Sequence, residues 1–251
     1  MLYITGDTHG DFTRFSTENF PEQKEMTKDD YVVICGDFGG IFHKDSESKT
    51  EKYWLKWLEQ KPFTTLFIDG NHENFDRLYT YPVKSFHGGN VHEIRPSVLH
   101  LMRGQVFTFE NKTFFTFGGA SSHDIRDGIL EMDDPRVKRW NKDQFKQFRV
   151  NRLSWWQQEL PTQDEMNEGM KNLEAHNFKV DYVLTHSPYS SVLSQLDGGS
   201  GLYHTDRLSD YLQDIKCRTE FHQWIFGHMH VNEIFYWDRS CCMYEQLQRL
   251  L

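Results

Sequence analysis

Two side chains of metal-ligand type follow the first apolar run of the chain. The run 1–5 ends at Gly6, and Asp7 and His9 come directly after it. Side chains two residues apart on an extended segment point to the same side, so both can reach one ion. Gly6 and Gly10 let the backbone turn tightly there. The segment therefore predicts the floor of an active site.

The same pattern recurs at four more places along the chain. In each, a short apolar run is followed by residues that can bind a metal ion, namely Asp37, Asn71, His186, and His228 with His230. Near-continuous apolar runs of this length are typical of strands buried on both faces, and open α/β sheets place their ligands beyond the carboxyl ends of the strands. We therefore expect the five strand ends to converge on one site.

The complete set of candidate ligands is too large for a single tetrahedral zinc ion. It consists of Asp7, His9, Asp37, Asn71, His186, His228 and His230. Two carboxylates, one amide oxygen and four imidazoles suit two divalent ions, with manganese favoured and iron or zinc admissible. Asp37 is the expected bridge, since a carboxylate has two oxygens and this one follows the central strand of the opening unit. Two ions about 3.5–4 Å apart can hold a phosphoryl group and activate a water molecule for hydrolysis.

Length and composition favour one domain spanning residues 1–251, because ligands from position 7 to position 230 must meet in one core. No stretch approaches the about 20 apolar residues of a membrane span, so no membrane partner is expected. Asp7 lies too near Met1 for a cleavable signal to precede it, and the four cysteines lack a disulfide-like spacing; both features favour the cytoplasm. The formal net charge of −9 argues against general affinity for nucleic acid.

The elements that must position the ligands begin with a βαβαβ order over residues 2–68. Three short strands, 98–101, 105–109 and 113–117, are expected to build a second sheet. A capping box at Thr162 and Glu165 predicts a helix that ends near residue 176. Later segments predict a helix at 208–215, a strand at 223–226 and closing strands at 233–237 and 241–244.

One segment differs from the acidic remainder of the chain. Residues 136–152 carry seven basic side chains against a single acid, Asp143. The apolar residues within it keep an imperfect helical spacing, which predicts a helix. Such a basic segment is more often a solvated face than a nucleic-acid groove. It nevertheless leaves open a nuclease that holds a single strand along this segment.

In order, the ligand blocks resemble those of the calcineurin-like metallophosphoesterases. The family pattern is D-x-H, G-D, G-N-H-[DE], a lone histidine and G-H-x-H. The corresponding blocks are residues 7–9, 36–37, 70–73, 186 and 227–230, so the resemblance covers nearly the whole chain. It implies an α/β fold of four layers, α/β/β/α, in which two mixed sheets are flanked by helices.

The resemblance also implies how the ligands are divided. One ion would be held by Asp7, His9, Asp37 and His230, and the other by Asp37, Asn71, His186 and His228. His72 would stand by the leaving group, which makes it a second catalytic residue besides Asp37. The implied activity is metal-dependent hydrolysis of a phosphomonoester or a phosphodiester.

One block departs from the pattern of the family's serine/threonine protein phosphatases. Gly40 and Ile41 stand where those enzymes have an aspartate and an arginine, so protein phosphatase activity is not expected. Another cation must then meet the phosphate. The loop 118–126 is the best candidate, because Arg126 offers a planar fork and His123 a smaller donor.

Three functions remain open at this point. The first is hydrolysis of a small phosphate ester, the second is cleavage of single-stranded nucleic acid, and the third is a non-catalytic scaffold of the same fold. A scaffold tolerates the loss of ligands, whereas this chain has the full set. Nucleic acid is therefore an admissible partner but is not favoured over a small ester.

Overall fold

The computed structural model describes residues 1–251, and its first sheet carries three of the ligand-bearing strands. The seven strands lie in the order β15–β1–β2–β3–β6–β5–β4. Their bounds are β1 Leu2–Thr5, β2 Tyr31–Cys35, β3 Thr64–Ile68, β4 Val83–Phe86, β5 Gly89–Arg95, β6 Val98–Leu101 and β15 Leu247–Arg249. Strands β1, β2, β3 and β6 are parallel. Their apolar residues are buried on both faces, as the near-continuous runs predict.

The second sheet has six strands in the order β13–β14–β12–β11–β8–β7. Their bounds are β7 Gln105–Phe109, β8 Lys112–Phe117, β11 Tyr182–Thr185, β12 Gln223–Phe226, β13 Glu233–Phe235 and β14 Ser240–Cys242. Strands β14, β12, β11 and β8 are parallel, while the two edge strands run antiparallel to their neighbours. Both sheets are therefore mixed, with a parallel centre.

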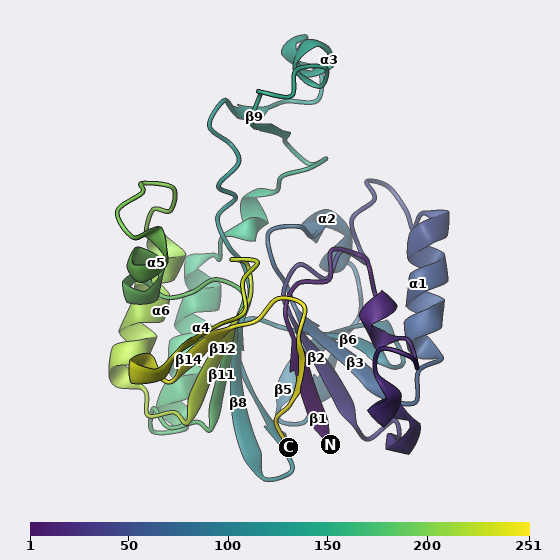
Figure 1. Cartoon of the computed structure of the whole chain (residues 1–251), viewed down its shortest axis with the longest axis vertical. Coiled ribbons are helices and arrows are strands. Elements are labelled where there is room, and N and C mark those ends of the chain that lie inside the picture. Colours follow the sequence, from purple (N-terminus) through teal and green to yellow (C-terminus); the bar gives the residue numbers. More distant parts are fainter.

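The sheets pack face to face, and helices cover their outer faces (Figure 1). Helix α1 (Lys49–Glu59) lies on the first sheet, and α4 (Gln163–Ala175), α5 (Ser190–Asp197) and α6 (Arg207–Arg218) lie on the second. One apolar cluster joins the sheets, with Ile4 and Val33 from the first and Leu184 and Ile225 from the second. The predicted α/β/β/α fold is thus confirmed, and in its βαβαβ opening the first crossover consists of two 3-10 turns instead of an α-helix. The single domain over residues 1–251 stays a prediction, which this shared core supports.

The predicted helix starts are found where the side chains supply caps. Thr162 Oγ1 accepts a hydrogen bond from the Glu165 amide, and the Glu165 carboxylate accepts one from the Thr162 amide, so α4 begins with a capping box. The remaining short helices are α2 Phe75–Leu78, α3 Arg136–Trp140 and the 3-10 turns Thr13–Phe15, Pro21–Glu25, Gln157–Glu159 and Tyr236–Asp238. None of the helices combines the length and the apolar character needed to cross a membrane.

One strand placement differs from the sequence prediction, and a further strand of the first sheet was not predicted. Strand β6 was expected in the second sheet, but it pairs in parallel with β3 of the first. Strand β15, at the end of the chain, returns to pair antiparallel with β1. Both pairings join segments that are distant in sequence, and strand propensity does not specify the partner of a strand.

The predicted helix over residues 136–152 is wrong. Only α3 is helical there, and the chain then turns into β10 (Phe148–Val150), which pairs with β9 (Gly128–Leu130). Residues 127–152, called the arm below, project away from the two sheets (Figure 1). None of the α3 residues is buried, so no packed face stabilises a longer helix. Asp143 instead accepts a hydrogen bond from the Phe145 amide and forms a turn.

Candidate active site

The five ligand-bearing strand ends lie at one edge of the two-sheet core. Strands β1, β2 and β3 are parallel in the first sheet, and β11 and β12 are parallel in the second, so within each sheet the carboxyl ends share an edge. The two edges meet below the arm (Figure 1). All seven predicted metal-ligating residues follow these strands, and the structure brings them together.

The ligand atoms form two groups that share one residue. Asp7, His9, Asp37 and His230 each offer an atom within 4.8 Å of the others, and Asp37, His186 and His228 do the same. In the first group the Nε2 atoms of His9 and His230 are 3.0 Å apart. In the second group His186 Nε2 is 3.4 Å from Asp37 Oδ1. The two groups of ligand atoms thus share the Asp37 carboxylate.

Two buried atoms of the predicted ligands lack any hydrogen-bond partner, and both are suited to a cation. They are Asn71 Oδ1 and His186 Nε2. The Nδ1 atom of His186 donates to the Cys35 carbonyl at 2.8 Å, so Nε2 is the nitrogen that can bind a metal ion once its proton is displaced. An unpaired buried polar atom costs about 1–3 kcal/mol, and a metal ion would remove that cost. The donor set therefore fits a divalent ion.

Four of the ligands have an unusual backbone conformation. The φ angles of His9, Asp37, His228 and His230 are 47°, 45°, 67° and 52°, all in the left-handed region. Non-glycine residues rarely adopt this region, and each such residue costs about 1–3 kcal/mol. The surrounding sheets hold these residues in place, so each of the four ligands carries backbone strain.

The glycines that precede the ligands leave room for another ligand to approach. A Cβ atom at Gly36, whose φ is +93°, would lie 2.0 Å from His186 Nδ1. A Cβ atom at Gly70 would lie 2.0 Å from Asp37 Oδ1. The glycines of the G-D and G-N-H blocks are thus required because a ligand from another strand packs directly against them.

The charges of the cluster favour a cation. Burial opposes ionisation of Asp37, but the neighbouring imidazoles of His186, His72 and His9 hold its pKa well below the usual range. Burial would also lower the pKa of His186, yet the carboxylates of Asp37 and Asp7 raise it to about 10. Without a metal, the two carboxylates therefore retain a proton at the centre of the site. A divalent cation can take the place of that positive charge.

A cavity of about 130 Å³ opens directly onto the ligands. It is lined by Asp37, Asn71, His72, His123, Asp124, Arg149, His228 and His230. The His72 backbone amide donates to Asp37 Oδ1 at 2.9 Å, which places its ring at the cavity wall. Burial is the main cause that lowers the pKa of His72, with the positive charge of Arg149 acting in the same direction. The ring makes no hydrogen bond of its own, so the structure shows no partner that orients it.

Arg149 is the cation of this cavity, and the sequence did not single it out as a site residue. It comes from β10 of the arm, and its Nε donates to Asp124 Oδ1 at 3.0 Å, while its Nη2 contacts Asp124 Oδ2. The only sequence signal was its membership of the basic segment. Gly40 and Ile41 offer no alternative, since Ile41 is buried in the core of the first sheet.

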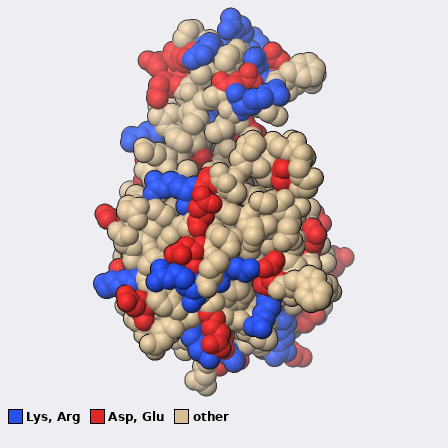
Figure 2. Space-filling view, turned by 90° about the vertical axis from the view of Figure 1, so that its left-hand side faces the viewer, with Lys and Arg blue, Asp and Glu red and all other residues tan.

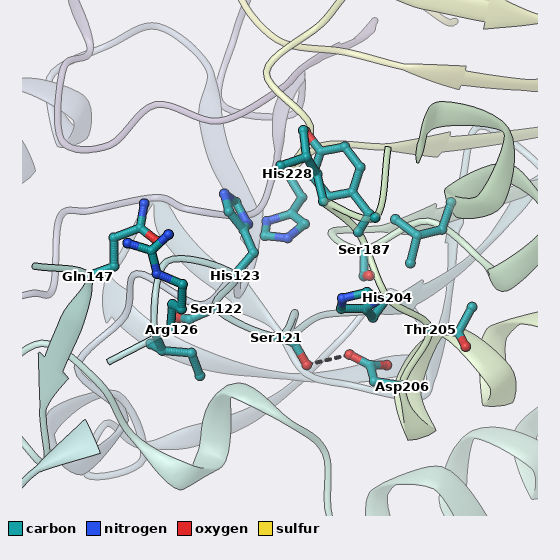
Figure 3. Close-up of a pocket in the computed structure, with 15 residues that line it drawn as sticks. Ser121, Ser122, His123, Arg126, Gln147, Ser187, His204, Thr205, Asp206 and His228 are labelled. Atoms are coloured by element: carbon teal, nitrogen blue, oxygen red, sulfur yellow. Dashed lines mark hydrogen bonds between the residues drawn. The ribbon is translucent and has the colours of Figure 1, made fainter. Parts of the chain in front are cut away.

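The two predicted substrate residues lie on a second cavity that adjoins the first. This cavity of about 570 Å³ is lined by His123, Arg126, Gln147, Tyr203, His204 and Asp206, among others (Figure 3). His123 and His228 line both cavities. Arg126, in contrast, lines only the larger cavity and not the one that opens onto the metal ligands. Arg149, and not Arg126, is therefore the arginine placed to meet a phosphate at the metal ligands.

Ser122 is another residue that the sequence did not single out. Its Oγ accepts a hydrogen bond of 3.3 Å from Asn71 Nδ2. The same oxygen donates to Glu159 Oε2 at 2.8 Å. Both Ser122 and Glu159 are buried. No pattern in the sequence links positions 71, 122 and 159, because they lie in three separate parts of the chain.

Comparison with known proteins agrees with this geometry. The model of the calcineurin-like phosphoesterase family matches residues 2–232, and the chain belongs to this family. It is a metal-dependent phosphoesterase by class, as the resemblance of its ligand blocks predicted.

Two individual proteins show the range of the similarity. Lariat debranching enzyme A of Xenopus laevis is 28% identical over 144 residues, which is 52% of this chain and 26% of that protein. The match thus spans about a quarter of that relative's length. The crystal structure of the phosphopantetheinyl hydrolase of Mycobacterium tuberculosis superposes with a TM-score of 0.47 at 13% identity, over 97% of this chain and 87% of the other.

Proposed function

We propose that the protein binds two divalent cations, with manganese favoured over iron or zinc, and hydrolyses a phosphate ester with them. Asp7, His9, Asp37 and His230 would hold the first ion, and Asp37, Asn71, His186 and His228 the second. The observation that carries this proposal is the sharing of Asp37 between the two ligand groups. The buried Asn71 Oδ1 and His186 Nε2 atoms support it, since neither has a hydrogen-bond partner in the protein.

The ions would supply Lewis acidity and an activated water molecule. The remaining functions belong to the side chains of the cavity. The guanidinium of Arg149 has the planar fork that suits two phosphate oxygens. His72 would stand by the departing oxygen and donate a hydrogen bond or a proton to it. Asp124 holds Arg149 until a phosphate competes for the same N–H groups.

The two cavities suggest how a substrate would be divided between them. The smaller cavity, about 130 Å³, has only polar and charged lining residues and suits a phosphoryl group. The larger one, about 570 Å³, would take the organic part of the ester. His123 and His228 line both cavities, and Figure 3 shows them side by side in the larger one. A small phosphomonoester or phosphodiester with one bulky polar substituent fits this arrangement.

A nuclease is the second candidate, because the relative from Xenopus laevis is named for debranching lariats. The charges of the arm do not favour it. Residues 127–152 contain seven basic and five acidic side chains, and Arg136 and Lys146 are paired with Asp134 and Asp127. Figure 2 shows blue and red side chains interspersed on the projecting knob of the arm. On the face shown, the arm thus has no continuous basic surface of the kind that a nucleic-acid backbone requires.

The test is metal-dependent hydrolysis. Protein stripped with a chelator should be inactive on nitrophenyl phosphate and on bis-nitrophenyl phosphate, and manganese should restore activity together with two bound ions per chain. Asp37→Asn should lose both, because it removes the one charge that both ions share. Asp124→Asn is the matched control for metal binding, since it lies in the same cavity outside the ligand groups. A protein that binds no manganese and hydrolyses neither ester would leave only the non-catalytic scaffold. The cytoplasmic location stays a prediction.

A further inference from the structure

The Asn71 amide has two ends, and only one of them can bind a cation. Its Oδ1 has a lone pair, whereas its NH₂ group carries two hydrogens and no acceptor. A half turn of the amide would therefore present the wrong end to the second ion. In the structure Oδ1 is buried without a partner, and Nδ2 donates to Ser122 Oγ at 3.3 Å. Something must keep the amide in this orientation.

Ser122 can do so only if its hydroxyl hydrogen is directed elsewhere. A hydroxyl has one hydrogen to donate and two lone pairs. The Ser122 hydroxyl donates to Glu159 Oε2 at 2.8 Å, and an ionised carboxylate can only accept. The oxygen of Ser122 is then left to accept, and the Asn71 NH₂ group is its donor. The polarity of the hydrogen-bond chain runs from Asn71 through Ser122 to Glu159.

The other hydrogen bonds of Glu159 hold its carboxylate in the orientation that meets the Ser122 hydroxyl. Its Oε1 accepts from the Ser122 amide at 3.2 Å and from Trp155 Nε1 at 2.6 Å. These two donors occupy one oxygen and leave Oε2 to the Ser122 hydroxyl. The residue is 3% exposed, and burial raises its pKa to about 7 against the opposing hydrogen bonds of Ser122 and Trp155. A buried carboxylate of this kind is costly, so a specific role must offset its burial.

The hydrogen bonds from Asn71 through Ser122 to Glu159 also connect the two halves of the fold. Asn71 follows β3 of the first sheet, Ser122 lies in the loop after β8 of the second, and Glu159 belongs to the 3-10 turn Gln157–Glu159. The turn is fixed in its own right, because Arg103 Nη2 donates to the Gln158 carbonyl at 2.7 Å and the Ala120 amide donates to the Glu159 carbonyl at 3.1 Å. A fixed acceptor can therefore impose an orientation on a side chain of the opposite sheet.

We infer that Ser122 and Glu159 are positioning residues that lock the Asn71 amide with its oxygen toward the second metal ion. This inference rests on the proposed two-metal function. It adds that Ser122 and Glu159 help to set the affinity for the second ion. Partners of metal ligands typically change metal affinity by about 10- to 100-fold when they are removed. We expect an effect of this size at the second ion alone.

The direct test is manganese binding, measured by calorimetric titration of chelator-treated protein at pH 8. Ser122→Ala should weaken the second binding event by about 10- to 100-fold and leave the first unchanged. The matched control is Ser121→Ala, because Ser121 Oγ bonds to Asp206 rather than to Asn71. Glu159→Gln should weaken the second event as well, since a glutamine amide at the Oε2 position would donate to Ser122 and free its hydroxyl hydrogen for Asn71.

A double-mutant cycle separates orientation from general loosening of the site. Asn71→Asp presents an oxygen whichever way the group turns, so Ser122→Ala should have little further effect in that background. If Ser122→Ala weakens the second event equally in the parent and in the Asn71→Asp background, an orienting role is not tenable. Circular dichroism and the melting temperature without metal check that each variant is folded.

The outcomes distinguish this inference from the proposed function. A parent protein that binds two ions, together with a Ser122→Ala variant that matches Ser121→Ala, would overturn the inference and leave the two-metal function intact. A parent that binds fewer than two ions would overturn both. Selective weakening of the second event, abolished in the Asn71→Asp background, is the result expected.

Discussion

The metal side of the cavity is built on strand ends, whereas its opposite side is built on a loop and the arm. Asp7, Asp37 and His186 follow strands that are buried on both faces, and they are themselves almost fully buried. Arg149 comes from the arm, which projects from the core and is held near the site by its ion pair with Asp124. Partly exposed ion pairs usually contribute little stability.

This difference separates two kinds of function in one cavity. The strand ends fix ligand atoms with backbone strain and close packing, which suits the fixed geometry of a metal pair. The loop and the arm can change in sequence without disturbing the core, which suits the choice of substrate. We therefore expect substitutions on the metal side to abolish metal binding or a step of hydrolysis. Substitutions on the arm side should reduce the rate of hydrolysis by degrees.

The largest expected effect beyond the ligands is at His72. His72→Asn should leave two bound manganese ions in place and slow the hydrolysis of alkyl phosphate esters by about 10²- to 10⁴-fold, because an alkoxide needs a proton as it departs. Nitrophenyl esters have good leaving groups and should lose less. Steady-state kinetics on both ester types measure the difference, and equal losses would contradict the role.

Arg149 should show an intermediate effect. Arg149→Ala removes a charged hydrogen-bond donor worth about 1.5–3 kcal/mol, so kcat/KM should fall by about 10- to 150-fold on every ester, with the metal content unchanged. Lys142→Ala is the control, since Lys142 also lies on the arm but does not line the cavity. If the two variants behave alike in kinetics, the phosphate is held by some other group.

Arg126 should matter only for larger substrates. It lines the cavity of about 570 Å³ and not the one at the metal ligands. Arg126→Ala should therefore leave the hydrolysis of nitrophenyl phosphate unchanged and raise KM for an ester whose organic part carries a second anionic group. A panel of phosphomonoesters, cyclic nucleotides and dinucleoside polyphosphates would show this dependence. A uniform loss on all of them would place Arg126 at the phosphate, as the sequence alone predicted.

The smallest effect concerns stability and pH. Burial raises the pKa of Glu159 from 4.5 to about 7 in the folded chain, so the folded state binds this proton more tightly than the unfolded state. The stabilising contribution is complete below about pH 4.5 and is lost as the pH rises through about 7. In metal-free protein, the free energy of unfolding of the parent should fall relative to Glu159→Gln by about 1–3 kcal/mol across this window. Denaturant titrations of both proteins at pH 5 and pH 8 measure this difference. If the free energy of unfolding of the two proteins changes equally with pH, Glu159 does not titrate with a raised pKa.

The sequence indicates where the candidate ligands converge for a physical reason. A short run of buried apolar residues predicts a strand, and the residues after it lie at the end of that strand. A glycine followed by a ligand at this point is a local pattern, which can be recognised without knowing the fold. The positions of Arg149 and Glu159 depend on contacts between distant segments, such as the ion pair with Asp124 and the turn held by Arg103. The near-helical spacing of the apolar residues in 136–152 predicts a helix, but none of the α3 residues is buried and the chain turns into β10 instead.

The central claim is that Asp37 is shared by two metal ions. Its most direct test is a crystal structure of the manganese-loaded protein with anomalous diffraction data at the manganese edge. We predict two anomalous peaks about 3.5–4 Å apart on either side of the Asp37 carboxylate. One should lie among Asp7, His9 and His230, and the other among Asn71, His186 and His228. A single peak, or two peaks that do not both contact Asp37, would contradict the account.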